Sequence, residues 1–154
     1  CKAMTSDRSQ LAAARSGFPN PKDHIILDYT MSKEPLAPAS IGGDQKLSDA
    51  MRWVIYALIE AEEKGITSLN IDEKLNEAEA NKNLSSIRRL LGVDSGLGEK
   101  LGLSDDFVVK IIKSTGNYGE IYERNLGPKS NLPIKRGYNN LYTKGGLLIS
   151  PPLK

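Results

Sequence analysis

The alternation of short apolar runs with one helix-forming stretch constrains the fold more than any other feature of the sequence. Residues 1–6 and 24–29 are such runs between turn-forming residues and predict strands, the second of them mostly buried. Residues 8–16 between them predict a short helix, and residues 36–41 form a further apolar run. The order strand, helix, strand, strand places the chain in the α/β class.

After these runs the sequence becomes helical. Asp44 is the predicted N-cap of a long amphipathic helix, whose apolar residues recur at helical spacing and which Gly65 ends. Trp53 and Tyr56 add bulk to this helix and predict core or rim packing. Residues 66–83 are polar and predict a loop with one helical turn.

Shorter helices are predicted further along. One spans residues 86–91, a second follows Ser104 as its N-cap, and a third follows Asn117. Glu120 stands three residues after Asn117, which is the spacing of a reciprocal capping box. Residues 135–143 predict a last helix or turn.

Composition leaves the broad class open within soluble globular proteins. The chain has 154 residues, enough for one sizeable core, with 39% hydrophobic residues, 26% charged residues and a net charge of +2. The charge balance argues neither for nor against nucleic acid, and no apolar run approaches the length of a membrane span.

The sequence starts without an initiator methionine or a signal peptide, inside a predicted strand, and we expect a fragment whose beginning is missing. Cys1 is the single cysteine. A disulfide partner in an upstream segment and a lone thiol of no consequence both remain open.

Residues that could perform catalysis are few. His24 is the only histidine, and a structural role at the start of a buried strand is favoured over general-base chemistry. A pair of Cys1 with His24 has no supporting motif, and no spacing fits a zinc site. Asp105-Asp106 and Glu62-Glu63 are adjacent carboxylates, which point in different directions on a helix and predict solvated faces.

Two phosphate-binding interpretations are also weak. Arg88-Arg89 could bind phosphate, but a charged helix surface is favoured. The stretch from Asp94 to Gly102 is rich in glycine, yet Gly92 and Gly96 are not followed by the Gly-Lys-Ser/Thr of a phosphate loop. We reject that motif.

Asp7 stands at the predicted strand-to-helix turn and has two interpretations. Its carboxylate could cap free N–H groups at the helix start, which is the common role of aspartate there. At the carboxyl edge of a sheet it could also face a ligand cleft. The residues alone favour capping and leave the second role open.

The order of segments resembles the later part of the periplasmic solute-binding protein of an amino-acid ABC transporter. The block Asn117-Tyr118-Gly119-Glu120 is specific to the general L-amino-acid-binding branch of that family. The other matching segments are residues 1–11, 23–27, 32–36, 52–53, 57–63, 87–92, 116–125, 136–142 and 145–147.

The resemblance implies the C-terminal part of a two-lobed α/β protein, a type II periplasmic binding protein with a helix-rich C-terminal extension. Residues 1–31 would end the second lobe as strand, helix and strand. Residues 32–35 would form the return crossover or hinge, and residues 36–154 would complete the first lobe.

The resemblance also implies a binding site. In the family, the aspartate at the position of Asp7 receives the α-ammonium group of the amino acid, and Thr5 and Ser6 could line the same rim. The arginine that binds the α-carboxylate and the residues that select the side chain would lie upstream. Lys2 departs from the family, which usually has an acidic residue after the cysteine.

The implied function is a periplasmic receptor that captures free L-amino acids and delivers them to the membrane permease of an ABC transporter. Its partners would be the amino acid, the permease and the missing N-terminal portion of the same protein. We expect no catalytic residue, metal, cofactor, nucleic acid or membrane insertion. The alternatives are an enzyme on the same fold, similar to cyclohexadienyl dehydratase, and a sensing or interaction module.

Overall fold

Helices and extended chain make up the computed structural model, which describes residues 2–94 and 96–153. Cys1 lies outside the described residues, and its pairing stays open. In chain order the helical elements are α1 (Arg8–Ser16), η1 (Pro21–Asp23), α2 (Gln45–Glu63), α3 (Ile71–Ala80), α4 (Ser85–Leu90), α5 (Leu97–Lys100), α6 (Phe107–Thr115), α7 (Tyr118–Asn125), η2 (Gly137–Asn139) and η3 (Tyr142–Lys144).

Both ends of α2 are where the sequence predicts them. The carboxylate of Asp44 accepts a hydrogen bond of 2.9 Å from the backbone N–H of Leu47. At the other end Gly65 has φ of 65°, and the N–H of Ile66 donates to the carbonyl of Ala61 over 2.8 Å. This is the Schellman arrangement, which glycine adopts without steric cost.

The described part of the chain divides into two compact units. One comprises the residues up to Ala37 together with Tyr122–Arg136, and the other comprises Pro38–Ile121 and the residues from Gly137 onward. The predicted lobe boundaries at residues 31 and 36, with a crossover between them, stay predictions.

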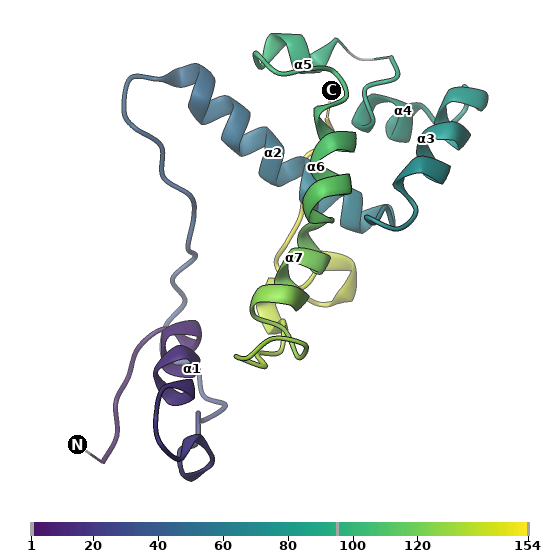
Figure 1. The fold of residues 1–154 in the computed structure, drawn as a ribbon. Coiled ribbons are helices and arrows are strands. Elements are labelled where there is room, and N and C mark those ends of the chain that lie inside the picture. Colours follow the sequence, from purple (N-terminus) through teal and green to yellow (C-terminus); the bar gives the residue numbers. More distant parts are fainter. Residues whose placement is uncertain (1, 95, 154) are drawn as a thin grey trace. The chain divides into compact units, whose positions relative to one another are not determined.

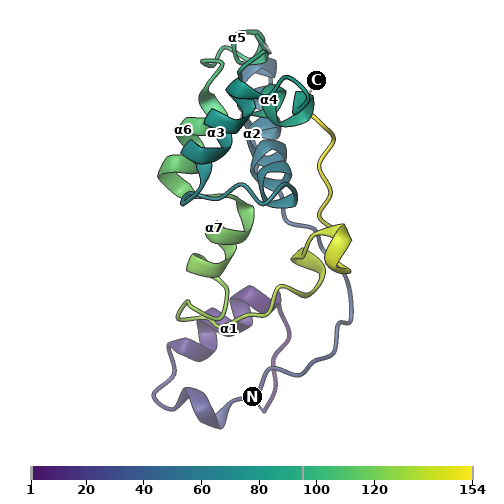
Figure 2. The same cartoon turned by 90° about the vertical axis from the view of Figure 1, so that its right-hand side faces the viewer.

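The larger unit holds the main hydrophobic core. Helix α6 contacts both α2 and α3, and α3 also contacts α4, as Figures 1 and 2 show from two sides. Trp53 packs against this core, as predicted, with its ring edge-on to Tyr56 at 5.7 Å. The buried core residues are Ala57, Ala61, Ile66, Ile71, Ala78, Leu90, Leu91, Phe107, Val108, Val109, Ile112 and Leu153.

The predicted strands are present only as extended chain. Residues 2–6, 24–29 and 36–41 are not paired with another strand, and the β-bridge between Leu141 and Leu148 is the only pairing among the described residues. Figure 1 accordingly shows plain loop on either side of α1. The burial predicted for residues 24–29 is wrong, because a strand is buried by neighbouring strands and by a covering layer.

Two helix predictions also need correction. The polar region 66–83, predicted as a loop with one helical turn, contains α3, a helix of 10 residues. Asp72 and Glu73 in its first turn complement the helix dipole. The polar composition of the region suggested a loop, although its Glu, Lys, Leu and Ala residues are good helix formers. Ser104 does not cap α6, which begins only at Phe107 after Asp106.

Helix α7 begins with the predicted capping box. The N–H of Asn117 donates to Glu120 Oε2 over 2.8 Å, and the N–H of Glu120 donates to Asn117 Oδ1 over 3.0 Å. The same side chains reach another segment of the chain. Asn117 Nδ2 donates to the carbonyl of Ile66 over 2.8 Å, and Ser68 Oγ donates to Glu120 Oε1 over 2.6 Å.

Two carboxylates of α2 hold the end of the chain. The N–H of Leu153 donates to the buried Glu60 over 3.1 Å, and the N–H of Ser150 donates to Glu63 over 3.2 Å. Glu60 also pairs with Lys64 at 3.4 Å. These contacts position Leu153 in the core, and they correct the prediction that Glu63 lies on a solvated face.

We expect Asn117→Ala to lower the free energy of unfolding by about 2 kcal/mol or more, because it removes a cap and leaves the buried carbonyl of Ile66 unpaired. Asp44→Ala is the matched control, since it removes a cap at an exposed helix start and should cost only about 1 kcal/mol. Urea unfolding followed by the fluorescence of Trp53 measures both. Equal losses would contradict the long-range role of Asn117.

Candidate functional site

Asp7 lies at the N-cap position of α1, at the turn where the sequence predicts it. Its backbone has φ of −54° and ψ of 141°, and its carbonyl accepts the first helical hydrogen bond from Leu11 N over 2.9 Å. Its side chain is exposed and makes no capping hydrogen bond. The favoured capping role of this carboxylate is therefore wrong. Among the described residues the carboxylate has no hydrogen-bond or ion-pair partner.

Thr5 and Ser6 stand next to Asp7 on the extended chain that enters α1, and both are exposed. The hydroxyl of Ser6 donates to the side-chain carbonyl of Gln10 in the first turn of α1. The three predicted residues therefore meet at one helix start. Their role toward a ligand stays a prediction.

His24 is exposed rather than set at the start of a buried strand. Its Nδ1 lies 3.1 Å from the carbonyl oxygen of Asn20, and its ring lies 4.5 Å from that of Phe18. These local contacts agree with the structural role that the sequence favours.

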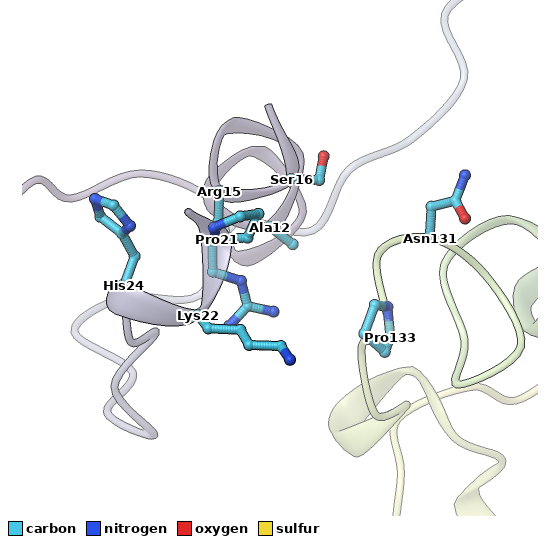
Figure 3. Close-up of a pocket in the computed structure, with 8 residues that line it drawn as sticks. All are labelled: Ala12, Arg15, Ser16, Pro21, Lys22, His24, Asn131 and Pro133. Carbon is cyan, nitrogen blue, oxygen red and sulfur yellow. The ribbon is translucent and has the colours of Figure 1, made fainter. Parts of the chain in front are cut away.

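A cavity of about 680 Å³ lies at the other end of α1 within the smaller unit. Figure 3 shows Arg15 and Lys22 on the side of α1 and η1, with Asn131 and Pro133 on the facing loop. Asp7 does not line this cavity. The cavity is therefore not the amino-acid site that the sequence predicts at Asp7.

Arg88 is buried and structural, which corrects the prediction of a charged helix surface. Its guanidinium forms two hydrogen bonds with the carboxylate of Asp94, one of them 2.7 Å from Nη2 to Oδ1. Nη1 donates to the carbonyls of Ala78 and Glu79 in the last turn of α3. These contacts join α3 to α4 and leave the group unsuited to bind phosphate. The hydrogen bond from Arg88 also lowers the pKa of Asp94 below its ordinary value.

Asp105 and Asp106 do not act as a pair. Asp105 accepts a hydrogen bond of 2.9 Å from the N–H of Gly98, and Asp106 pairs with Lys110 at 2.8 Å. The hydrogen bond from Lys110 lowers the pKa of Asp106. Each carboxylate thus has a structural partner of its own.

Gly92, one of the two glycines named for the rejected phosphate loop, is required by close packing. Gly92 has φ of 78°, and a Cβ atom there would lie 2.1 Å from the carbonyl oxygen of Asp105.

Among the described residues no group of three or more His, Cys, Asp and Glu side chains is arranged to hold a metal ion. The helices within the described ranges are all too short or too polar to cross a membrane.

Sequence comparison identifies the class of protein. The chain is 46% identical over 156 residues to the general L-amino acid-binding periplasmic protein AapJ of Rhizobium johnstonii. It is 42% identical over 154 residues to the glutamate/glutamine/aspartate/asparagine-binding protein BztA of Rhodobacter capsulatus. It is 43% identical to the putative amino-acid ABC transporter-binding protein YhdW of Escherichia coli. Each match includes the whole chain but only 44% of the relative.

Structure comparison agrees with the sequence. A periplasmic binding protein of an ABC transporter from Brucella ovis, solved with glutathione bound, matches 97% of this chain and 46% of its own, with a TM-score of 0.87 and 45% identity. No protein-family model matches. The chain belongs to the family of amino-acid-binding periplasmic proteins of ABC transporters, and it corresponds to their C-terminal 44%. The resemblance predicted from the sequence is confirmed.

The pH dependence of stability should contain a contribution from Asp94. Because its pKa is lowered in the folded state, the ion pair with Arg88 contributes fully above the unfolded pKa of about 3.9 and is lost as the pH falls through the folded pKa. Asp94→Asn should lower the urea midpoint at neutral pH, and the difference from the wild type should shrink below about pH 4.

Asp49→Asn is the control for this experiment, since it breaks an exposed ion pair of 3.1 Å with Arg52 and should change the midpoint little at neutral pH. A difference between Asp94→Asn and the wild type that stays constant from neutral to acid pH would contradict the assignment.

Asp7→Asn should change the free energy of unfolding by about 0.5 kcal/mol or less, because the carboxylate is exposed and makes no capping bond. Thermal unfolding followed by circular dichroism measures this. A loss as large as that of a working cap would show that the carboxylate stabilises α1.

Proposed function

We propose that this chain is the C-terminal part of a periplasmic receptor that captures free L-amino acids and delivers them to an ABC transporter permease. The names of its relatives support this function, since AapJ is a general L-amino acid-binding protein and BztA is a glutamate/glutamine/aspartate/asparagine-binding protein. The periplasm is the proposed location on the same ground. The permease and the N-terminal portion of the receptor are the proposed partners.

The observation that carries the proposal at the level of residues is the exposed carboxylate of Asp7, which makes no capping hydrogen bond. A carboxylate only accepts hydrogen bonds, and it therefore suits the three donors of an α-ammonium group. A hydrogen bond of this charged kind contributes about 1.5–3 kcal/mol. Thr5 and Ser6 would lie beside the same group at the rim of the cleft.

The chemistry of the ligands points to the zwitterionic head as the recognised part. Glutathione, which the Brucella ovis protein holds, carries a free α-ammonium and α-carboxylate at its γ-glutamyl end. The amino acids in the names of the other relatives carry the same head. We therefore propose that Asp7 contacts the feature that all these ligands share, and that closure of two lobes excludes water from it.

An enzyme on this fold is the rival from another class. The relatives are binding proteins by name, and the carboxylates of Asp105, Asp106 and Glu60 each have a structural partner within the chain. Turnover of prephenate or arogenate by the full-length protein would favour the enzyme over the receptor.

Calorimetry on the full-length protein that contains this segment tests the proposal. We expect binding of glutamate, glutamine and leucine, no binding of N-acetylglutamate, and affinities at least about tenfold weaker in Asp7→Ala because a charged hydrogen bond is lost. Asp28→Ala is the control, since it removes an exposed carboxylate of the same unit that pairs with Arg8.

Three results would count against the proposal. Unchanged affinity in Asp7→Ala would remove the role of that residue, and an equal loss in Asp28→Ala would show an effect of charge alone. Binding of glutathione without binding of any free amino acid would change the ligand class from amino acids to peptides.

A further inference from the structure

The cavity of about 680 Å³ in the smaller unit has a cationic wall. Arg15 in the last turn of α1 and Lys22 in η1 both line it, whereas no described aspartate or glutamate does. Figure 3 shows the guanidinium of Arg15 and the ammonium group of Lys22 directed into the space in front of the facing loop. The cavity therefore presents two positive charges to a molecule that enters it.

Neither positive charge is neutralised within the part of the chain that the structure describes. The side chains of Arg15 and Lys22 have no hydrogen-bond or ion-pair partner there, although Arg15 is half-buried. Arg15 complements the negative end of the α1 dipole, but that end carries only about half a charge against two full ones. The unpaired N–H donors of its planar guanidinium suit an oxyanion.

The two walls of the cavity are held by hydrogen bonds within the chain. On one side, the N–H of His24 donates to the carbonyl of Pro21 over 3.3 Å and closes η1. On the facing loop, Ser130 Oγ donates to the carbonyl of Gly127 over 2.8 Å and accepts from the N–H of Leu132 over 3.0 Å. Because both walls are formed in advance, a ligand would lose little affinity to the ordering of backbone.

The remaining lining indicates the kind of anion. Ala12, Pro21 and Pro133 offer apolar surface beside the charged groups. A cavity of this volume suits a small organic molecule rather than an inorganic ion alone. Two positive charges match a phosphate monoester, which carries a charge near −2 at neutral pH, better than a single carboxylate. Arginine and lysine are also the side chains that commonly bind phosphate groups.

We propose that this cavity is a second ligand site, which binds a small organic phosphate. Arg15 and Lys22 hold the phosphate group, and Pro21 and Pro133 contact the organic body of the ligand. The site is separate from Asp7, which does not line the cavity. The inference goes beyond the amino-acid function and does not depend on it.

Calorimetry on the full-length protein that contains this segment tests the proposal, with phenyl phosphate as the probe. The ionic strength is kept constant, because salt screens exposed charges. We expect saturable binding of phenyl phosphate. Inorganic phosphate, which lacks the organic body, and benzoate, which carries one charge, should each bind about threefold or more weakly than phenyl phosphate.

Matched variants assign the site. Arg15→Gln and Lys22→Gln should each weaken the binding of phenyl phosphate about fivefold or more, since each removes a charged hydrogen bond. Lys2→Gln is the control, because it removes the same charge from an exposed residue of the same unit that does not line the cavity. It should change the affinity about twofold or less. The side chains of Arg15 and Lys22 have no partner among the described residues, so neither variant should change the unfolding midpoint without ligand.

Several results would overturn the proposal. The absence of saturable binding, or unchanged affinity in Arg15→Gln and Lys22→Gln, would remove the site, and an equal loss in Lys2→Gln would show attraction by net charge alone. Equal affinity for benzoate or for inorganic phosphate would contradict the ligand class. Asp7→Ala separates this inference from the amino-acid function, because that variant should bind phenyl phosphate as the wild type does. A loss there would place the probe at Asp7 and contradict a second site.

Discussion

The reciprocal cap formed by Asn117 and Glu120 is the contact on which the larger unit most depends. Glu120 accepts hydrogen bonds from the N–H of Asn117 and from the N–H and hydroxyl of Ser68, while Asn117 donates to the carbonyl of Ile66. Ile66 closes the C-terminus of α2, and Ser68 lies in the loop that leads to α3. One pair of side chains therefore sets the end of α2, the approach to α3 and the start of α7. Asn117 is buried, so its polar atoms need these hydrogen-bond partners. Other arrangements of the three segments would leave these atoms unpaired and are therefore disfavoured.

Charged residues with patterns typical of solvated helix faces bind other parts of the chain in this protein. Glu60 accepts from the backbone of Leu153, which is 93 residues away in sequence, and the buried Arg88 joins the end of α3 to Asp94. A helical pattern tells which side of a helix is polar, but it does not tell whether that side faces water or a returning segment. A buried carboxylate or guanidinium is stable only when its hydrogen bonds are satisfied, so each such residue marks a place where two segments must meet.

The features that the sequence predicted correctly are those whose physical cause lies within a few residues. The cap at Asp44, the stop at Gly65 and the box of Asn117 with Glu120 each involve neighbours along one helix. Features that depend on distant segments were missed, as Arg88 and Glu60 illustrate. The buried strand predicted at residues 24–29 is the clearest case, because its apolar run is present while no strand among the described residues pairs with it. For the site, the position of Asp7 at the helix start was predictable from the sequence. The absence of a capping hydrogen bond from its carboxylate was not predictable, since capping depends on side-chain geometry.

Under the proposed function, the uncapped carboxylate of Asp7 bears on the orientation of a bound amino acid. The start of a helix presents free N–H groups and a partial positive charge, which by themselves favour a carboxylate over an ammonium group. A full negative charge at Asp7 outweighs the roughly half charge of a helix end and reverses the local preference. If the Asp7 side chain were used as a cap, its charge would be turned toward the N–H groups and partly neutralised by them. An uncapped α1 with an outward carboxylate therefore suits the ammonium end of a zwitterion, and the carboxylate end must then be bound by cationic groups elsewhere in the receptor.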